Sequence, residues 1–159
     1  SQAVVNPDLL ADMTAVLGSQ SVVAVLDYKI DFLGRRQLFI NNGKKRAKIG
    51  FWELARRCQE YGVGELVFNC IDKDGSQEGL DHELADRLRS ELSVPVTVMG
   101  GAMDHADIER VSKTFGPIGI GVGSLFVFKG KHRAVLINYP PLDLKRSLTK
   151  NPEVTDLHV

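Results

Sequence analysis

The chain has 159 residues, enough for one domain with a sizeable core, and its 43% hydrophobic and 25% charged residues are typical of a globular protein. Its 20 basic and 20 acidic residues cancel, so no overall field favours nucleic acid or an anionic membrane as a partner. No apolar run approaches the ~18 residues of a transmembrane helix, and the first residues do not have the pattern expected of a signal peptide.

Predicted helices and strands alternate along the chain. Helices are expected where apolar residues recur every three to four positions, and strands where β-branched apolar residues run together. The expected helices cover residues 7–17, 51–61, 80–92 and 105–115, and the expected strands cover residues 21–27, 65–71, 94–99 and 118–122. The first strand is a continuous apolar run, which is typical of a strand buried on both faces. Residues 150–159 are expected to form a polar tail.

This order predicts an α/β fold in which right-handed strand–helix–strand units build a parallel sheet. Open doubly wound sheets and closed (β/α)8 barrels are both built in this way. A full barrel takes at least about 200 residues, so a chain of 159 residues could hold only about half of one.

The 23 residues between Asp27 and Phe51 interrupt the alternation. Two short runs flank Asn42-Gly43, which is a strong signal for a β-hairpin. The segment carries one acid, Asp31, and seven cations: Lys29, Arg35, Arg36, Lys44, Lys45, Arg46 and Lys48. It is either a solvated basic hairpin or a mobile lid over an anionic substrate.

The predicted strands end in residues that could bind a ligand, because parallel α/β folds bind ligands at the carboxyl ends of their strands. Gly100-Gly101 and Gly123-Ser124 could present backbone N–H groups to a phosphate. Asp27 ends an apolar strand, where partial desolvation would suit general acid or base catalysis. Lys29, two residues later, should lie on the same side and could bind phosphate or tune Asp27.

Other polar groups carry weaker signals. The Asp72-x-Asp74-Gly75 run does not have the spacing of an EF-hand loop, and the four histidines share no metal-ligand spacing, so we expect neither a metal nor another cofactor. Cys58 and Cys70 form no CxxC pair or disulfide framework, which favours a cytoplasmic protein, and Cys70 is expected to be a small buried residue. Because residue 1 is Ser rather than Met, we also expect a processed or truncated chain.

Five segments resemble the cyclase subunit of imidazole glycerol phosphate synthase. In chain order they are NPDLLADMTAVLGSQSVVAVLD, GKKRAKIGFWELARRCQEYGVGEL, IDKDGSQEGLD, VMGGAMD and VGSLF, within residues 6–128. That family folds as a (β/α)8 barrel of two similar halves, and this chain is similar to the second. The resemblance therefore implies that residues 1–149 form the carboxyl-terminal half of a TIM barrel, with strands five to eight.

The resemblance also implies an activity. The family's cyclase, a lyase of histidine biosynthesis, takes ammonia from a glutaminase partner and closes an imidazole ring on a bis-phosphorylated ribulosyl-formimino-carboxamide substrate. The resemblance assigns Asp27 as catalytic acid or base and Glu65 as a gate residue for ammonia. The implied substrate or phosphate contacts are Lys29, Asn69, Asp74, Gly75, Ser76, Gly100, Gly101, Gly123 and Ser124. The family's other catalytic aspartate lies in the first half, so an amino-terminal half-barrel or a second copy is expected to close the barrel.

Two features are more similar to a sister branch of the family. Asn69 stands where the histidine-pathway enzymes carry a small hydroxyl residue, and residues 125–148 replace the usual final amphipathic helix. Members of the sister branch work with glutaminase and amidotransferase partners to place acetamidino groups on surface sugars of bacterial polysaccharides. A phosphate-binding half-barrel that dimerises without catalysis is a third possibility.

Overall fold

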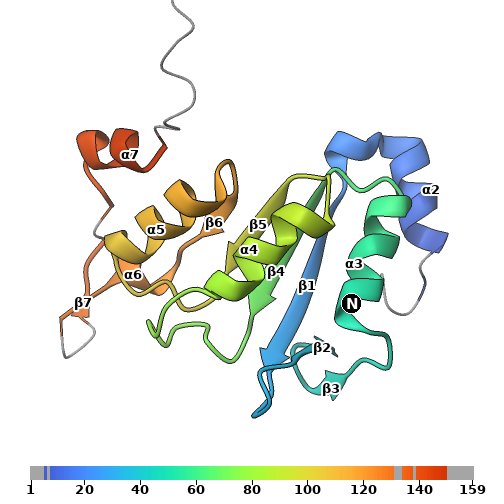
Figure 1. Ribbon diagram of the computed structural model, residues 1–159, viewed down its shortest axis with the longest axis horizontal. Helices are drawn as coiled ribbons and strands as arrows, with labels where there is room; N and C mark the ends of the chain where they lie inside the picture. The colour runs from blue at the N-terminus through green and yellow to red at the C-terminus, as the bar shows by residue number, and fades with distance from the viewer. Residues whose placement is uncertain (1–5, 7, 131–133, 138, 150–159) are drawn as a thin grey trace, which may run out of the picture.

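The computed structural model describes residue 6 and residues 8–130, 134–137 and 139–149. Its main sheet has six strands in the order β3-β2-β1-β4-β5-β6 (Figure 1). Their bounds are Val23–Ile30 (β1), Arg36–Ile40 (β2), Lys45–Arg46 (β3), Glu65–Cys70 (β4), Val96–Met99 (β5) and Gly119–Gly121 (β6). Strands β1, β4, β5 and β6 are parallel, which confirms the predicted parallel sheet.

Helices follow the strands in the predicted order. Their bounds are Asp8–Leu17 (α2), Phe51–Glu60 (α3), His82–Glu91 (α4), His105–Phe115 (α5), Ser124–Val127 (α6) and Leu142–Thr149 (α7). A short hairpin of β7 (Phe128–Lys129) and β8 (Ala134–Val135) lies between α6 and α7. Helix α4 begins two residues later than predicted because Asp81 caps it, its carboxylate accepting a hydrogen bond from the Leu84 N–H at 3.0 Å. The polar tail predicted for residues 150–159 lies outside the described residues.

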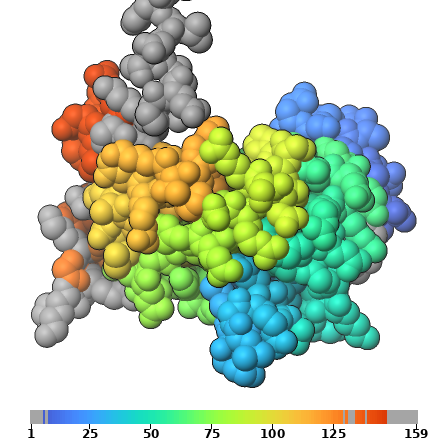
Figure 2. Space-filling view, in the orientation of Figure 1, coloured from blue at the N-terminus to red at the C-terminus, as the bar shows by residue number. Residues whose placement is uncertain are grey.

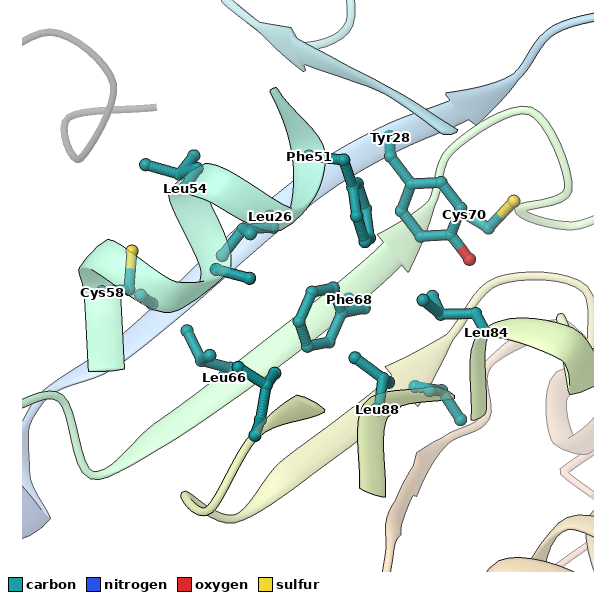
Figure 3. Close-up of a cluster of buried hydrophobic side chains, with 14 of the residues drawn as sticks. Leu26, Tyr28, Phe51, Leu54, Cys58, Leu66, Phe68, Cys70, Leu84 and Leu88 are labelled. Carbon is teal, nitrogen blue, oxygen red and sulfur yellow. The ribbon is translucent and has the colours of Figure 1, made fainter. Parts of the chain in front are cut away.

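The core lies between one face of the sheet and helices α3, α4 and α5. Alternate residues of β1 and β4 point into it, with Leu26, Leu66 and Phe68 almost fully buried. Phe51, the first residue of α3, packs its ring 5.5 Å from that of Phe68 (Figure 3). The apolar stripes read from the sequence therefore form one continuous core.

The opposite face of the sheet is open to solvent, so the prediction that the first strand is buried on both faces was wrong. Val23 and Val25 are 50% and 48% exposed, although both are large and apolar. The period of two along a strand sends odd-numbered residues of β1 away from the helices, and no other layer in the described ranges covers them. The apolar run thus marks a face that the described chain leaves uncovered.

The predicted hairpin is present as β2 and β3. Its turn places Asn41, Asn42 and Gly43 at positive φ, as the Asn-Gly signal indicates. Strand β2 pairs with β1 only from Tyr28 to Ile30, so the hairpin extends the sheet at the carboxyl end of β1. In Figure 2 this segment, light blue to teal, projects from the lower edge of the molecule.

Candidate active site at the carboxyl ends of the strands

One row of residues crosses the open face near the carboxyl ends of the strands. In the strand register Asp27 lies beside Asn69, Asn69 beside Met99, and Met99 beside Gly121. Each is an odd-numbered strand residue and so points away from the helices. The row brings Asp27 and Asn69, which are 42 positions apart in the sequence, into direct contact.

Asn69 holds the carboxylate of Asp27 in place. The side-chain amide of Asn69 donates a hydrogen bond of 2.8 Å to Asp27 Oδ1. Asn69 Oδ1 is enclosed and accepts no hydrogen bond in the described structure. Asp27 is partly buried here, so its carboxylate is oriented by a neighbour and still lies on the open face.

The predicted glycine loops meet around a hollow of about 70 Å³. The hollow is lined by residues after three neighbouring strands: Asp74, Gly75 and Gln77 after β4; Met99, Gly100, Gly101 and Ala102 at β5; Gly121, Gly123, Ser124 and Leu125 at β6. Asp74 is the only charged member of this lining, and its carboxylate would repel an anion. An anion in the hollow would therefore depend on backbone N–H groups and on the hydroxyl of Ser124.

Two of these glycines are required by the backbone. Gly100 and Gly101 have φ of +96° and +95°, a conformation that residues with a side chain rarely adopt. A Cβ on Gly100 would lie 2.4 Å from the carbonyl oxygen of Cys70, and one on Gly101 would lie 2.7 Å from that of Gly79. The close approach of these loops keeps the hollow narrow. Helix α5 starts only at His105 and is capped by Asp104, whereas the four-residue helix α6 starts at Ser124 in the lining and its N-cap, Gly123, makes no side-chain hydrogen bond.

Two of the predicted substrate contacts, Lys29 and Ser76, do not line the hollow, and Glu65, predicted as a gate residue rather than a substrate contact, lies at the far end of the sheet. The ammonium of Lys29 lies over the ring of Phe39, 4.7 Å from its centroid. Ser76 does not line the hollow, and its hydroxyl accepts a hydrogen bond from the Glu78 N–H. Glu65 starts β4, at the opposite end of the sheet from Asp27, and accepts a hydrogen bond of 2.6 Å from the hydroxyl of Thr97.

A buried ion pair behind Asp27 was not foreseen from the sequence. Arg36 of the hairpin donates two hydrogen bonds to Asp81, at 2.8 and 2.6 Å, and both side chains are less than 8% exposed. The hydroxyl of Tyr28, the residue after Asp27, donates to the same carboxylate. Burial by itself would raise the pKa of Asp81, but the hydrogen bonds and charge of Arg36 outweigh it and hold that pKa below its usual range. Asp81 thus fastens the end of β1 and the hairpin to the start of α4.

Asp107 fastens two of the site loops in a similar way, and this role was also not predicted from the sequence. Its carboxylate accepts hydrogen bonds from the N–H groups of Leu80 and Met103, and it lies 2.6 Å from His82 Nε2. Burial opposes ionisation, but these hydrogen bonds lower the pKa of Asp107 overall. The sequence signal was only an acid in the first turn of α5, which is common at helix starts.

The cysteines and histidines form no reactive cluster in the described part of the chain. Cys70 is buried, as predicted, and burial raises the pKa of its thiol to about 12. Among the residues of known placement, no three His, Cys, Asp or Glu side chains come together in a way that could hold a metal ion. None of the described helices is long and apolar enough to cross a lipid bilayer.

Comparison with known proteins gives a consistent match. Residues 1–133 match the family model described as histidine biosynthesis protein. A Leptospira interrogans protein named "Putative imidazole glycerol phosphate synthase subunit HisF" is 44% identical over 149 residues, covering 93% of this chain and 59% of the relative. A protein of Pseudomonas aeruginosa with the same description, numbered hisF2, is 40% identical over 141 residues, covering 89% and 56%. The imidazole glycerol phosphate synthase subunit HisF of Alkaliphilus metalliredigens is 34% identical over 110 residues, covering 67% and 44%. The chain spans about half the length of these relatives.

Proposed function

The chain belongs to the histidine biosynthesis protein family, and on that basis we propose that it is the carboxyl-terminal half of an ammonia-dependent cyclase that resembles imidazole glycerol phosphate synthase. The family is a (β/α)8 barrel, and the alternating strands and helices here have that architecture over about half its length. Under this proposal the open sheet face is half of the barrel interior, and the carboxyl ends of the strands are half of the active-site mouth.

The observation that carries the proposal is the Asp27–Asn69 contact beside the glycine hollow. Met99 and Gly121 belong both to the row of Asp27 and to the lining of the hollow, so one ligand could reach both places. A phosphate held in the hollow would anchor the substrate. Asp27 would then move a proton at the reacting carbon or nitrogen as ammonia adds and the imidazole ring closes.

Turnover of the family substrate with ammonium, measured with this chain completed by its amino-terminal half-barrel, tests the role of Asp27. Asp27→Asn keeps a side chain that can contact Asn69 but removes the proton acceptor, and a general acid–base group is worth about 10²–10⁴ in rate. Asp86→Asn is the matched control, because Asp86 is an exposed acid on α4. Turnover by Asp27→Asn at the control's rate would refute this role.

Phosphate binding to the hollow can be measured without turnover. Asp74→Asn removes the only charge of the lining and should tighten the binding of inorganic phosphate, whereas Ser124→Ala should weaken it. A backbone-amide NMR titration would report both, because the amides of Gly100, Gly101 and Ser124 lie at the hollow. Equal affinity in both variants and in the unaltered chain would place the phosphate elsewhere.

The open face supports the proposal that another half-barrel completes the enzyme. Val23 and Val25 on this face are half exposed. An uncovered apolar sheet face with unpaired edge strands favours association. The covering partner would be an amino-terminal half-barrel, which supplies the second catalytic aspartate of the family, and Val25→Asp should abolish its binding in sedimentation experiments. The glutaminase subunit would dock at the opposite end of the sheet, where Glu65 lies.

A second candidate is the sister branch that modifies surface sugars, and Asn69 is the observation that favours it. The amide at this position contacts the carboxylate of Asp27, and the side chain of a small hydroxyl residue has a shorter reach. Rescue of a histidine auxotroph by the complete enzyme would assign the histidine pathway. Failure to rescue, by an enzyme that still uses ammonia in vitro, would assign the sugar branch.

A further inference from the structure

One stretch of the hairpin carries cations without partners. Elsewhere in the described ranges, every lysine or arginine whose side chain is described has an interaction. These are ion pairs for Arg35, Arg36, Arg56, Arg57, Arg87, Arg110 and Lys113; backbone carbonyls for Lys73 and Arg89; aromatic rings for Lys29 and Lys145; and a further contact for Arg146. The four described cations without such an interaction all lie in residues 44–48: Lys44, Lys45, Arg46 and Lys48. In a chain with net charge zero, this is a marked concentration of unpaired positive charge.

The backbone holds this stretch in place. Lys45 and Arg46 form β3 and pair with Ile40 and Phe39 of β2. The next residue, Ala47, is buried and donates a hydrogen bond of 2.8 Å to the carbonyl of Leu38. The positive charges are therefore displayed from a paired strand, and ordering them for a ligand costs side-chain entropy but little backbone entropy.

Three of these cations, Lys45, Arg46 and Lys48, face a groove of about 480 Å³ between the hairpin and the start of α3. Its lining contains the cations Lys45, Arg46, Lys48 and Arg57, the apolar residues Ile40, Ala47 and Ile49, and the acid Glu53. Glu53 is already bound to Arg57 at 2.8 Å, so three positive charges in the lining remain uncompensated. Gly50 caps α3 without a side-chain hydrogen bond, which adds the partial positive charge of the first turn at the same place.

We propose that this groove binds a small phosphorylated metabolite with at least two negative charges. Its volume lies within the range of about 300–1,000 Å³ that is usual for small-molecule sites. Arginine and lysine together suit phosphate oxygens, and the floor of Ile40, Ala47 and Ile49 can receive an apolar part of the ligand. A nucleic acid would need a basic track longer than one groove. The groove shares no lining residue with the glycine hollow, so this is a second anion site on the same end of the sheet.

Titration of the full chain with inorganic pyrophosphate tests the proposal. In a ¹H–¹⁵N NMR spectrum at low salt, saturable shifts are expected for the amides of residues 45–51. The triple variant Lys45→Gln, Arg46→Gln, Lys48→Gln should bind pyrophosphate about tenfold more weakly or worse, since each exposed charge pair contributes modestly and three are removed. These residues are exposed, so the variant should remain folded, which its amide spectrum will show directly.

A second triple variant is the matched control. Arg87→Gln, Arg110→Gln, Lys113→Gln removes three charges from helices α4 and α5, which do not line the groove, and it should keep the affinity of the unaltered chain. The proposal is overturned if residues 45–51 show no saturable shift, or if both triple variants lose affinity equally. It is also overturned if only a long polyanion such as duplex DNA binds there and pyrophosphate does not compete. Shifts confined to Gly100, Gly101 and Ser124 would assign pyrophosphate to the hollow alone and equally refute a site in the groove.

Discussion

Replacing Arg36 with Met should destabilise the protein by about 3–4 kcal/mol at pH 7, because it leaves the buried carboxylate of Asp81 without its cation. Asp81 accepts four hydrogen bonds, two from Arg36, one from the Tyr28 hydroxyl and one from the Leu84 N–H, so the variant retains two. The unpaired charge can escape by taking up a proton. From an ordinary pKa of about 3.9, protonation at pH 7 costs about 4 kcal/mol, which limits the penalty.

The loss of stability in Arg36→Met should also depend on pH. The cost of protonating Asp81, which is the upper limit of the stability loss, falls by about 1.4 kcal/mol for each pH unit and reaches about 1.5 kcal/mol at pH 5. The unaltered protein still has its ion pair at pH 5. Urea unfolding at pH 7 and pH 5 measures both values. The double variant Arg36→Met, Asp81→Asn buries no charge and keeps an acceptor for Leu84, so it should regain much of the lost stability. A deficit below about 1 kcal/mol at pH 7, or a double variant less stable than Arg36→Met alone, would refute the reasoning.

Three further predictions concern the loops and the buried acids. Gly100→Ala should lower the free energy of unfolding by about 2–4 kcal/mol, because its Cβ would clash with the carbonyl of Cys70 at a strained φ. Gly123→Ala is the control, since a Cβ there has no neighbour within 4 Å, and it should change stability by less than about 0.5 kcal/mol. Urea unfolding compares the two variants. The pKa of Asp107 is lowered on folding, so the ionised carboxylate stabilises the fold above the unfolded pKa of about 3.9 and this contribution is lost as the pH falls further. In Asp107→Asn the free energy of unfolding should therefore fall less steeply with decreasing pH in the acid range. Burial raises the pKa of the Cys58 thiol to about 11 and that of the Cys70 thiol to about 12. A thiol reagent at pH 7.5 should therefore label neither cysteine until the protein unfolds. Rapid labelling of the folded chain would contradict this prediction.

The fold was largely predictable because its helices and strands repeat simple local patterns. Phe51, Leu54, Ala55 and Cys58 form a stripe at helical spacing, and all four are buried in the core. The exposure of Val23 and Val25 was not predictable, since an apolar run has the same letters whether its second face is covered or open. That difference depends on a layer beyond the strand, which local pattern does not encode.

The placement of the candidate site residues was predictable where it rests on strand ends and not where it rests on long-range pairs. Asp27 and the glycine loops follow from the rule that ligands gather at the carboxyl ends of parallel strands. Arg36 was counted as one of seven hairpin cations, yet it is buried against Asp81, 45 positions later. The pattern of charges along the chain does not show which acid pairs with Arg36, because only the folded structure brings Arg36 and Asp81 together.

Strand β2 also sets a limit on how another chain could join the sheet. It occupies the outer edge of β1 from Tyr28 to Ile30 and leaves the edge from Val23 to Asp27 without a strand in the described structure. A parallel strand added there can advance only as far as Asp27 before it meets the hairpin. The hairpin therefore acts as a stop that fixes the register of the incoming strand, and the last residue that this strand can pair would lie level with the carboxylate of Asp27.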